Sequence, residues 1–472
     1  MSKELMIERI EKAQKEIEAK RETVQQGKFR QDYHFMAETG WINDPNGLIY
    51  FKGKYHFFYQ YNPYSGFWDC MHWGHAVSED MIHWEYLPLA LAPSEVYDDH
   101  LKGGCFSGSA IEHDGKLFLI YTGTCNNGNG FEQAQCIAYS EDGIHFEKYE
   151  GNPVITAPEG VPTDLFRDPK VWKHDDTYYV VCGASKNGFA QARLYKSTDM
   201  FHWEFVNVLA ESRGEWGYMW ECPDFFTLEG QKVLSVSPQG LTREEFRFQN
   251  IYQSGYFILK DGKPEEKDFR EWDHGFDFYA PQTFQDGKDR RIIIGWMGMP
   301  DADEEYVNPT AQSEGWQHCL TVPREVTYKN GMLYKYPVKE LNGLRENGTS
   351  ISGSSVELPV NGPFDLDIQV KGDQDKVSLG ENLFLEYQGG DVILTLSETA
   401  GAGRKVRKAH VPSGKVESLR ILADTTAVEI YVNGGEVVFS TRYYPETQAQ
   451  AVKVEAADVD GKIYGLKNYV ME

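Results

Sequence analysis

The sequence predicts an all-β protein: a five-bladed β-propeller followed by a C-terminal β-sandwich, with a short N-terminal helix. Two observations lead to this prediction. A hairpin pattern recurs at nearly constant spacing through the first 340 residues, and strands of a different rhythm follow a polar, Gly/Ser-rich stretch. Because 472 residues exceed one ordinary hydrophobic core, we expect a helical extension at 1–30, a propeller at 31–340 and a sandwich at 345–472.

The N-terminal segment, residues 3–26, has the pattern of an amphipathic helix. Ile7, Ile10, Ala13 and Ile17 recur at helical spacing between charged residues. A helix that binds a partner would show the same pattern, but packing against the chain's own propeller is the simpler expectation.

The repeated unit consists of a strand, a tight turn and a second, more apolar strand. It occurs in the stretches GLIYFKGKYHFFYQ, SAIEHDGKLFLIYTG, KVWKHDDTYYVVCG, DFFTLEGQKVLSVS and QTFQDGKDRRIIIGW. The turns fall at Gly53, Gly115, Asp176, Gly230 and Gly287, which are 54 to 62 residues apart. Five hairpin units at such regular spacing are what a five-bladed propeller requires.

The hairpin repeat stops at about residue 340, and the rest of the chain has a different pattern. The stretch NGLRENGTSISGSS predicts a linker, and the segments after it alternate apolar and polar residues. Asn433-Gly434 between two such segments predicts a hairpin turn. We therefore expect an all-β sandwich whose main role is to brace the propeller. Its strands could also form a homodimer, and the sequence does not decide this.

Composition and charge narrow the function classes. A formal net charge of −25 argues against a nucleic-acid partner. The charged first thirty residues contain no apolar run that predicts a secretion signal or a membrane segment. Seven cysteines without a C-x-x-C pair argue against a disulfide framework or a zinc site. We expect a cytoplasmic protein.

Three acids occupy similar places in the repeat. Counting back seven to nine residues from each turn gives Asp44, Ser107, Asp168, Glu221 and Tyr279. Innermost strands of a propeller surround one channel, so these residues are expected at one rim. Acids that merely begin strands, or a calcium site, would give the same pattern. The neighbouring Arg167 and tryptophans suit a sugar better, so we predict no metal and no cofactor.

The motifs around these acids resemble those of a known family. WINDPNG at 41–47, FRDP at 166–169 and ECPD at 221–224 are similar to the three signature blocks of glycoside hydrolase family 32. The stretches FYQYNP, WGHAVSEDMIHWE, FSGS, YAPQTF and GWQHCLTVPRE agree in order. The resemblance covers nearly the whole chain and implies a retaining β-fructofuranosidase, with closest similarity to bacterial sucrose and sucrose-6-phosphate hydrolases.

The resemblance also implies roles for individual residues. Asp44 would be the nucleophile, Glu221 the general acid/base, and Asp168 a stabiliser of the transition state. The residues implied to line the fructose pocket are Asn43, Gln60, Trp68, Phe106, Ser107, Arg167, Tyr279 and Trp296. Cys222 is expected to be a small residue that supports the neighbouring Glu221, rather than a reactive thiol.

Several alternatives share these motifs. Fructosyl transfer uses the same three acids, and a propeller that binds fructosides without cleaving them is a non-catalytic alternative. The partner is expected to be a small sugar: sucrose, sucrose 6-phosphate or a short fructo-oligosaccharide. A phosphate subsite would need a cation, for which Lys102, Lys186 and Arg193 are candidates by chain position.

Overall fold

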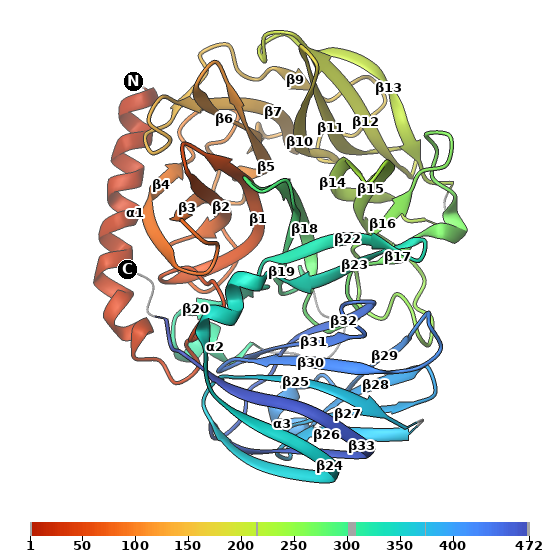
Figure 1. Ribbon diagram of the computed structural model, residues 1–472. Coiled ribbons are helices and arrows are strands. Elements are labelled where there is room, and N and C mark those ends of the chain that lie inside the picture. Colours follow the sequence, from red (N-terminus) through yellow and green to blue (C-terminus); the bar gives the residue numbers. More distant parts are fainter. Residues whose placement is uncertain (1, 214–215, 301–307, 373, 470–472) are drawn as a thin grey trace.

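The computed structural model describes residues 2–213, 216–300, 308–372 and 374–469. In these ranges five β-sheets surround a common centre, and a larger sheet system lies on one side of them (Figure 1). The predicted fold class, a five-bladed propeller with a C-terminal sandwich and an N-terminal helix, is confirmed. No helix of the described ranges has the length and apolar character needed to cross a membrane.

Each blade begins with its innermost strand. These strands are β1 (Gly40–Phe51), β5 (Gly104–His113), β10 (Phe166–His174), β14 (Met219–Leu228) and β18 (Tyr279–Gln285). They contact one another in a closed ring, β1 with β5, β5 with β10, β10 with β14, β14 with β18, and β18 with β1. One end of every innermost strand therefore faces the same end of the central channel.

The remaining strands extend each blade outward. Blade one adds β2 (Lys54–Asn62), β3 (His72–Ser78) and β4 (Trp84–Leu91). Blade two adds β6 (Lys116–Asn126), β7 (Phe131–Ser140), β8 (Glu147–Lys148) and β9 (Ile155–Thr156). Blade three adds β11 (Thr177–Lys186), β12 (Phe189–Ser197) and β13 (Glu204–Glu211). Blade four adds β15 (Gln231–Gln239), β16 (Gly255–Ile258) and β17 (Arg270–Glu271), with the short helix η1 (Glu266–Asp268) between the last two.

Blade five closes the ring. It adds β19 (Arg291–Met297), β21 (Cys319–Leu320), β22 (Arg324–Lys329) and β23 (Met332–Pro337). Between them, α2 (Pro309–Ser313) leads to β20 (Trp316–Gln317), which pairs in parallel with β1. The predicted turns all lie between the first and second strands of a blade. At two of them Gly53 and Gly115 adopt φ of 86° and 76°, a conformation that glycine reaches without strain.

The N-terminal helix α1 (Ser2–Gln25) lies along the outside of blade one next to β4 (Figure 1). Its buried face consists of Met6, Ala13, Ile17 and Val24, whereas Ile7 is 46% exposed. The prediction that Ile7 belongs to the apolar face is therefore wrong, because the helix turns Met6 toward the propeller instead. The helix packs on its own chain, as the simpler expectation held.

The C-terminal strands form one connected sheet system that folds over itself. They are β24 (Arg345–Asn361), β25 (Phe364–Lys371), β26 (Gln374–Leu379), β27 (Leu383–Gln388), β28 (Asp391–Leu396), β29 (Val406–His410), β30 (Ser418–Ala423), β31 (Ala427–Val432), β32 (Val437–Arg442) and β33 (Ala449–Leu466). The two halves of β33 pair with different strands, β26 and β25, and side chains from both layers share one buried apolar cluster. Two short helices, η2 (Lys339–Leu344) and α3 (Glu398–Gly401), complete the described elements.

Two local predictions for this region have opposite outcomes. The Asn433-Gly434 turn joins β31 to β32, with φ of 50° and 68°, as predicted. The predicted linker NGLRENGTSISGSS is wrong, because most of it belongs to strand β24. Pairing of β24 with β33 along its length supplies the backbone hydrogen bonds that the polar sequence gave no reason to expect.

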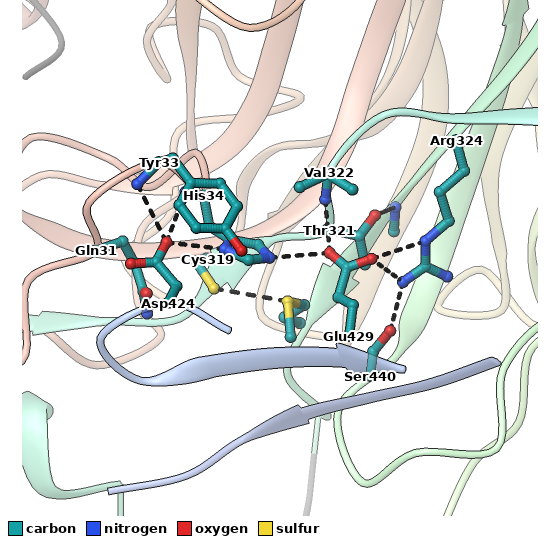
Figure 2. A network of polar contacts seen from close by, with 12 residues as sticks. Gln31, Tyr33, His34, Cys319, Thr321, Val322, Arg324, Asp424, Glu429 and Ser440 are labelled. Atoms are coloured by element: carbon teal, nitrogen blue, oxygen red, sulfur yellow. Dashed lines mark hydrogen bonds and ion pairs between the residues drawn. The ribbon is translucent and has the colours of Figure 1, made fainter. Parts of the chain in front are cut away.

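A buried ionic cluster joins the propeller to the C-terminal sheets (Figure 2). The ring of His34 is fully buried, and its Nδ1 and Nε2 lie 2.8 Å from Asp424 Oδ2 and 3.0 Å from Glu429 Oε1. Arg324 of β22 donates to Glu429 Oε2 from Nε at 3.0 Å and from Nη2 at 2.6 Å. The other end of the same guanidinium contacts Asp273 at 3.0 Å. Residues some 390 positions apart in sequence thus hold the two regions together.

Candidate active site

A cavity of about 650 Å³ opens at the end of the channel where the innermost strands begin. The predicted catalytic and fructose-pocket residues all line it: Asn43, Asp44, Gln60, Trp68, Phe106, Ser107, Arg167, Asp168, Glu221, Tyr279 and Trp296. Residues that sequence reasoning missed also line it: Trp41, Thr124, Phe131, Gln133, Asp164 and Pro300. Trp41 belongs to the first motif and could have been found there. The others come from outer strands and loops and carry no local signal.

The innermost strands of blades three, four and five carry the same bulge. Their last paired residues before it are Arg167, Glu221 and Tyr279. The next residues, Asp168, Cys222 and Ala280, have φ of 63°, 46° and 46°. Because positive φ is uncommon outside glycine, this shared conformation marks equivalent positions. The expectation that Asp168, Glu221 and Tyr279 are equivalent is therefore wrong by one residue, since Asp168 corresponds to Cys222 and Ala280.

Asp44 is held by neighbours on two blades. The Ser107 hydroxyl donates to its Oδ2 at 2.5 Å, and the Asn43 amide donates to its Oδ1 at 3.0 Å. Desolvation by the surrounding protein raises the pKa of Asp44 to about 6, and the charge of Glu221 adds to this, while the Ser107 and Asn43 hydrogen bonds oppose it. The carboxyl group is therefore fixed in orientation and ionised at neutral pH.

Asp168 is more deeply buried, with 7% of its surface exposed. Burial raises its pKa to about 7, against the opposing charge of Arg167, and the carboxylates of Glu221 and Asp44 add to the rise. The backbone N–H of Cys222 donates to Asp168 Oδ2 at 2.9 Å. The bulge at Cys222 thus supplies a fixed donor to this carboxyl group.

The Cys222 thiol bridges two acids. Its Sγ lies 3.6 Å from both Asp44 Oδ2 and Asp168 Oδ2. Burial and the three neighbouring carboxylates raise the pKa of this thiol well above its ordinary value, so it stays protonated. The expectation that Cys222 supports Glu221 is therefore wrong, because its thiol contacts the two aspartates instead.

Glu221 accepts hydrogen bonds on both carboxylate oxygens. Arg167 donates to Oε1 from Nε at 3.0 Å and from Nη2 at 2.9 Å. The Gln239 amide and the Tyr279 hydroxyl donate to Oε2 at 2.7 Å and 2.6 Å. These partners come from blades three, four and five, so the orientation of Glu221 depends on how the blades are packed.

Aromatic side chains form the wall of the cavity. Trp68 is 39% exposed and meets Phe106 edge-on at a ring-centroid distance of 6.0 Å. Trp296 is buried between Trp41 and Tyr279, at 5.8 Å and 6.4 Å. The Gln60 amide is held by the Cys105 carbonyl oxygen at 2.8 Å. An apolar wall with a few fixed polar groups suits a small polyhydroxylated ligand.

Comparison with known proteins places this geometry in a family. The family model described as "Glycosyl hydrolases family 32 N-terminal domain" matches residues 34–337, well over half of the chain. The chain belongs to glycosyl hydrolase family 32. A second model, "Glycosyl hydrolases family 32 C terminal", matches residues 389–468 of this family 32 enzyme.

Individual relatives of the family 32 enzyme match it over more than nine tenths of its length. It is 40% identical to the sucrose-6-phosphate hydrolase of Bacillus subtilis, covering 92% of this chain and 93% of the relative. It is also 40% identical to the raffinose invertase of Escherichia coli, covering 91% and 92%. A Bombyx mori family 32 β-fructofuranosidase variant, solved in complex with sucrose, superimposes with a TM-score of 0.85 at 35% identity, covering 97% and 98%. The chain is a glycoside hydrolase, so the non-catalytic alternative no longer applies.

The three cationic candidates for a phosphate subsite have different outcomes in the family 32 enzyme. Lys102 lines the cavity, where its Nζ lies 3.2 Å from Asp69 Oδ1. Lys186 and Arg193 are not among the described residues that line it. Lys186 instead donates to the Glu159 carbonyl oxygen at 3.3 Å, and Arg193 packs over Phe205 at 4.7 Å.

Proposed function

We propose that this family 32 hydrolase cleaves the β-fructofuranosyl bond of small sucrose-type sugars with retention of configuration. Asp44 is the nucleophile, Glu221 the general acid/base and Asp168 the stabiliser of the transition state. The observation that carries the proposal is the convergence of three carboxylates from three blades on one sugar-sized cavity. Two carboxyl groups that divide the nucleophilic and acid/base roles are the machinery of retaining glycosidases.

The hydrogen bonds of Asp44 suit the first half of the reaction. Ser107 and Asn43 each hold one carboxylate oxygen, so the group is oriented before substrate arrives. Attack by a carboxylate oxygen on the anomeric carbon of the fructosyl unit forms an ester bond as the bond to the leaving sugar breaks. Glu221 gives its proton to the departing oxygen.

The partners of Glu221 suit the second half. Water attacks the fructosyl ester while the Glu221 carboxylate takes the water proton, and Asp44 is released. Arg167, Gln239 and Tyr279 hold that carboxylate in place. Asp168, fixed by the Cys222 backbone, accepts hydrogen bonds from fructose hydroxyls that strengthen as positive charge grows on the ring.

The proposed substrates share a terminal fructosyl unit: sucrose, sucrose 6-phosphate and short fructo-oligosaccharides. The names of the relatives, which include a sucrose-6-phosphate hydrolase and a raffinose invertase, support this class. Fructosyl transfer to a second sugar is the alternative, and product analysis at high substrate concentration distinguishes it from hydrolysis. We place the enzyme in the cytoplasm, where reducing conditions keep the Cys222 thiol in the form that contacts both aspartates.

We propose that the Lys102 ammonium binds a phosphate group on the leaving sugar. The test compares kcat/KM for sucrose 6-phosphate and for sucrose, in the wild type and in Lys102→Gln, with Lys186→Gln as the matched lysine outside the cavity. We expect the phosphorylated sugar to be preferred by about tenfold, or about 1.4 kcal/mol. Lys102→Gln should reduce that ratio and Lys186→Gln should leave it unchanged. If the two kcat/KM values of the wild type were nearly equal, the enzyme would not recognise the phosphate.

A further inference from the structure

A second cavity of about 650 Å³ lies farther along the same innermost strands. The active-site cavity uses the first residues of β1, β10 and β14, including Asp44, Asp168 and Glu221. The second cavity is lined by later residues of those strands, among them Leu48 and Ile49 of β1. It therefore belongs to the opposite end of the propeller channel. Nothing in the proposed reaction uses it.

Two cations face one anion at this end. Lys170 and Arg291 line the cavity together with the buried carboxylate of Asp224. Lys170 Nζ lies 3.5 Å from Asp224 Oδ2 and donates to the Thr283 carbonyl oxygen at 2.5 Å. Within the described part of the chain, the hydrogen bond found for the Arg291 guanidinium is a long one, 3.5 Å to Thr283 Oγ1. Burial lowers the pKa of both Lys170 and Arg291, against the opposing charge of Asp224.

The carboxylate of Asp224 has one satisfied and one unsatisfied oxygen. Its Oδ2 accepts hydrogen bonds from the Thr283 backbone N–H and hydroxyl, each at 2.8 Å. Its Oδ1 is buried and, among the described residues, has no hydrogen-bond partner. The accessible charges of this cavity are therefore cationic, since Arg291 is half-buried and Lys173 and Lys232 are exposed.

The mouth of the cavity adds positive charge, and its wall adds an aromatic face. Lys173 and Lys232 line the cavity and are exposed. Trp172 and Tyr179 stack with ring centroids 5.6 Å apart and an interplanar angle of 18°. In a chain of net charge −25, four cationic side chains around one cavity form a local reversal of sign.

We propose that this second cavity binds a phosphorylated monosaccharide. Arg291 and the exposed Lys173 and Lys232 receive the phosphate, and the Trp172–Tyr179 pair offers an aromatic face on which the sugar ring packs. The site is distinct from the catalytic cavity, and the inference holds whichever fructoside the enzyme cleaves.

The test is isothermal titration calorimetry of the full-length protein with glucose 6-phosphate as the probe. Inorganic phosphate and glucose are titrated separately. We expect saturable binding of the sugar phosphate, at least tenfold weaker binding of phosphate alone, and no detectable binding of glucose. Equal affinity for inorganic phosphate and glucose 6-phosphate would overturn the role of the sugar ring. No saturable binding of either would overturn the site.

Variants assign the binding to one end of the channel. The titrations are repeated in a Lys102→Gln background, so that the proposed phosphate contact at the catalytic end does not contribute. In this background Arg291→Gln should weaken the binding of glucose 6-phosphate at least tenfold, whereas Lys186→Gln, at a lysine that is not among the described residues lining either cavity, should not change it. Loss of all saturable binding in Lys102→Gln alone would place the sugar phosphate in the catalytic cavity and contradict the proposal. Circular dichroism and Tm check that Arg291→Gln is folded. If it is not, the exposed Lys232→Gln replaces it, with an expected severalfold loss of affinity, and an unchanged affinity counts against the proposal.

Discussion

The catalytic cavity and the joint between propeller and C-terminal sheets both hold buried acids, but the pKa values of Asp44 and Asp168 rise whereas those of Asp424 and Glu429 fall. Burial raises the pKa of Asp44 to about 6 and that of Asp168 to about 7. At the joint, burial again opposes ionisation, yet the pKa of Glu429 falls to about 2 and that of Asp424 is also lowered (Figure 2).

Counter-charges account for the difference. Asp424 and Glu429 share His34, and Glu429 also has Arg324. In the catalytic cavity three carboxylates share Arg167, which pairs at 2.9 Å with Glu221 and lies 4.0 Å from Asp168. Asp273 shows the same dependence on counter-charge. It contacts only Nη1 of Arg324, and burial raises its pKa. Buried acids thus form a stabilising ionic cluster where enough cations neutralise them, and acids with raised pKa values where cations are too few.

The largest expected effect is at the catalytic end. Asp44→Asn removes the proposed nucleophile and should lower kcat by about 10⁴-fold or more. The same change removes a desolvated charge, so the free energy of unfolding should rise, by up to about 3 kcal/mol at neutral pH. Steady-state kinetics and urea denaturation measure the two quantities. A variant that loses stability along with activity would contradict the view that Asp44 is held at a cost.

At the joint the expected loss is in stability. Glu429→Gln leaves His34 and Arg324 without their shared anion, which should cost about 3–5 kcal/mol of unfolding free energy. Glu357→Gln, on the exposed part of strand β24, is the matched control and should change stability by less than about 0.5 kcal/mol. Urea denaturation at pH 7 compares them. Equal stabilities would mean that the joint is not an ionic clamp.

His34 makes the clamp sensitive to alkaline pH. Hydrogen bonds and charges from Asp424 and Glu429 outweigh burial and raise its pKa from 6.5 to about 9. Because the folded state holds this proton more tightly, the stabilisation is complete below about pH 6.5 and is lost as pH rises through 9. It amounts to about 3 kcal/mol. Unfolding free energy measured from pH 6 to 10 should fall for the wild type and much less for His34→Gln, with the exposed His410→Gln as control.

A smaller effect is expected from the hydrogen bond of Ser107. That bond lowers the pKa of Asp44, so Ser107→Ala should move the acid limb of kcat/KM, expected near pH 6 in the wild type, to higher pH. Ser109→Ala is the matched control, because the Ser109 hydroxyl donates to the Pro169 carbonyl oxygen at 2.8 Å instead. A limb that stays in place in Ser107→Ala would show that Asp44 does not set it.

The sequence predicts the catalytic end better than the joint, because its signals are local. A turn residue recurs in each blade at a spacing of about sixty residues, and the motifs around Asp44, Asp168 and Glu221 stand at the start of three of the blades. The exact register was not predictable. Asp168 lies one position past the last paired residue of its strand, whereas Glu221 is itself that residue in the next blade. This offset is set by the pairing of each innermost strand with the second strand of its blade.

The joint depends on contacts between distant segments. His34 meets Asp424 across 390 residues, and no periodicity links the two. Strand β24 was misread for a related reason, since its polar sequence becomes a strand through pairing with β33. Motifs of neighbouring residues can therefore be predicted from the sequence. Counter-charges and strand partners that tertiary packing brings together cannot.

The most direct test of the central claim is to trap the proposed fructosyl ester on Asp44. Glu221→Gln is incubated with p-nitrophenyl β-D-fructofuranoside, whose leaving group needs no protonation, and the quenched protein is digested and analysed by mass spectrometry. The account predicts one fructosyl unit on the peptide that contains Asp44, and none in the Asp44→Asn/Glu221→Gln double variant. An adduct on another residue, or turnover of this substrate with inversion at the anomeric carbon, would contradict it.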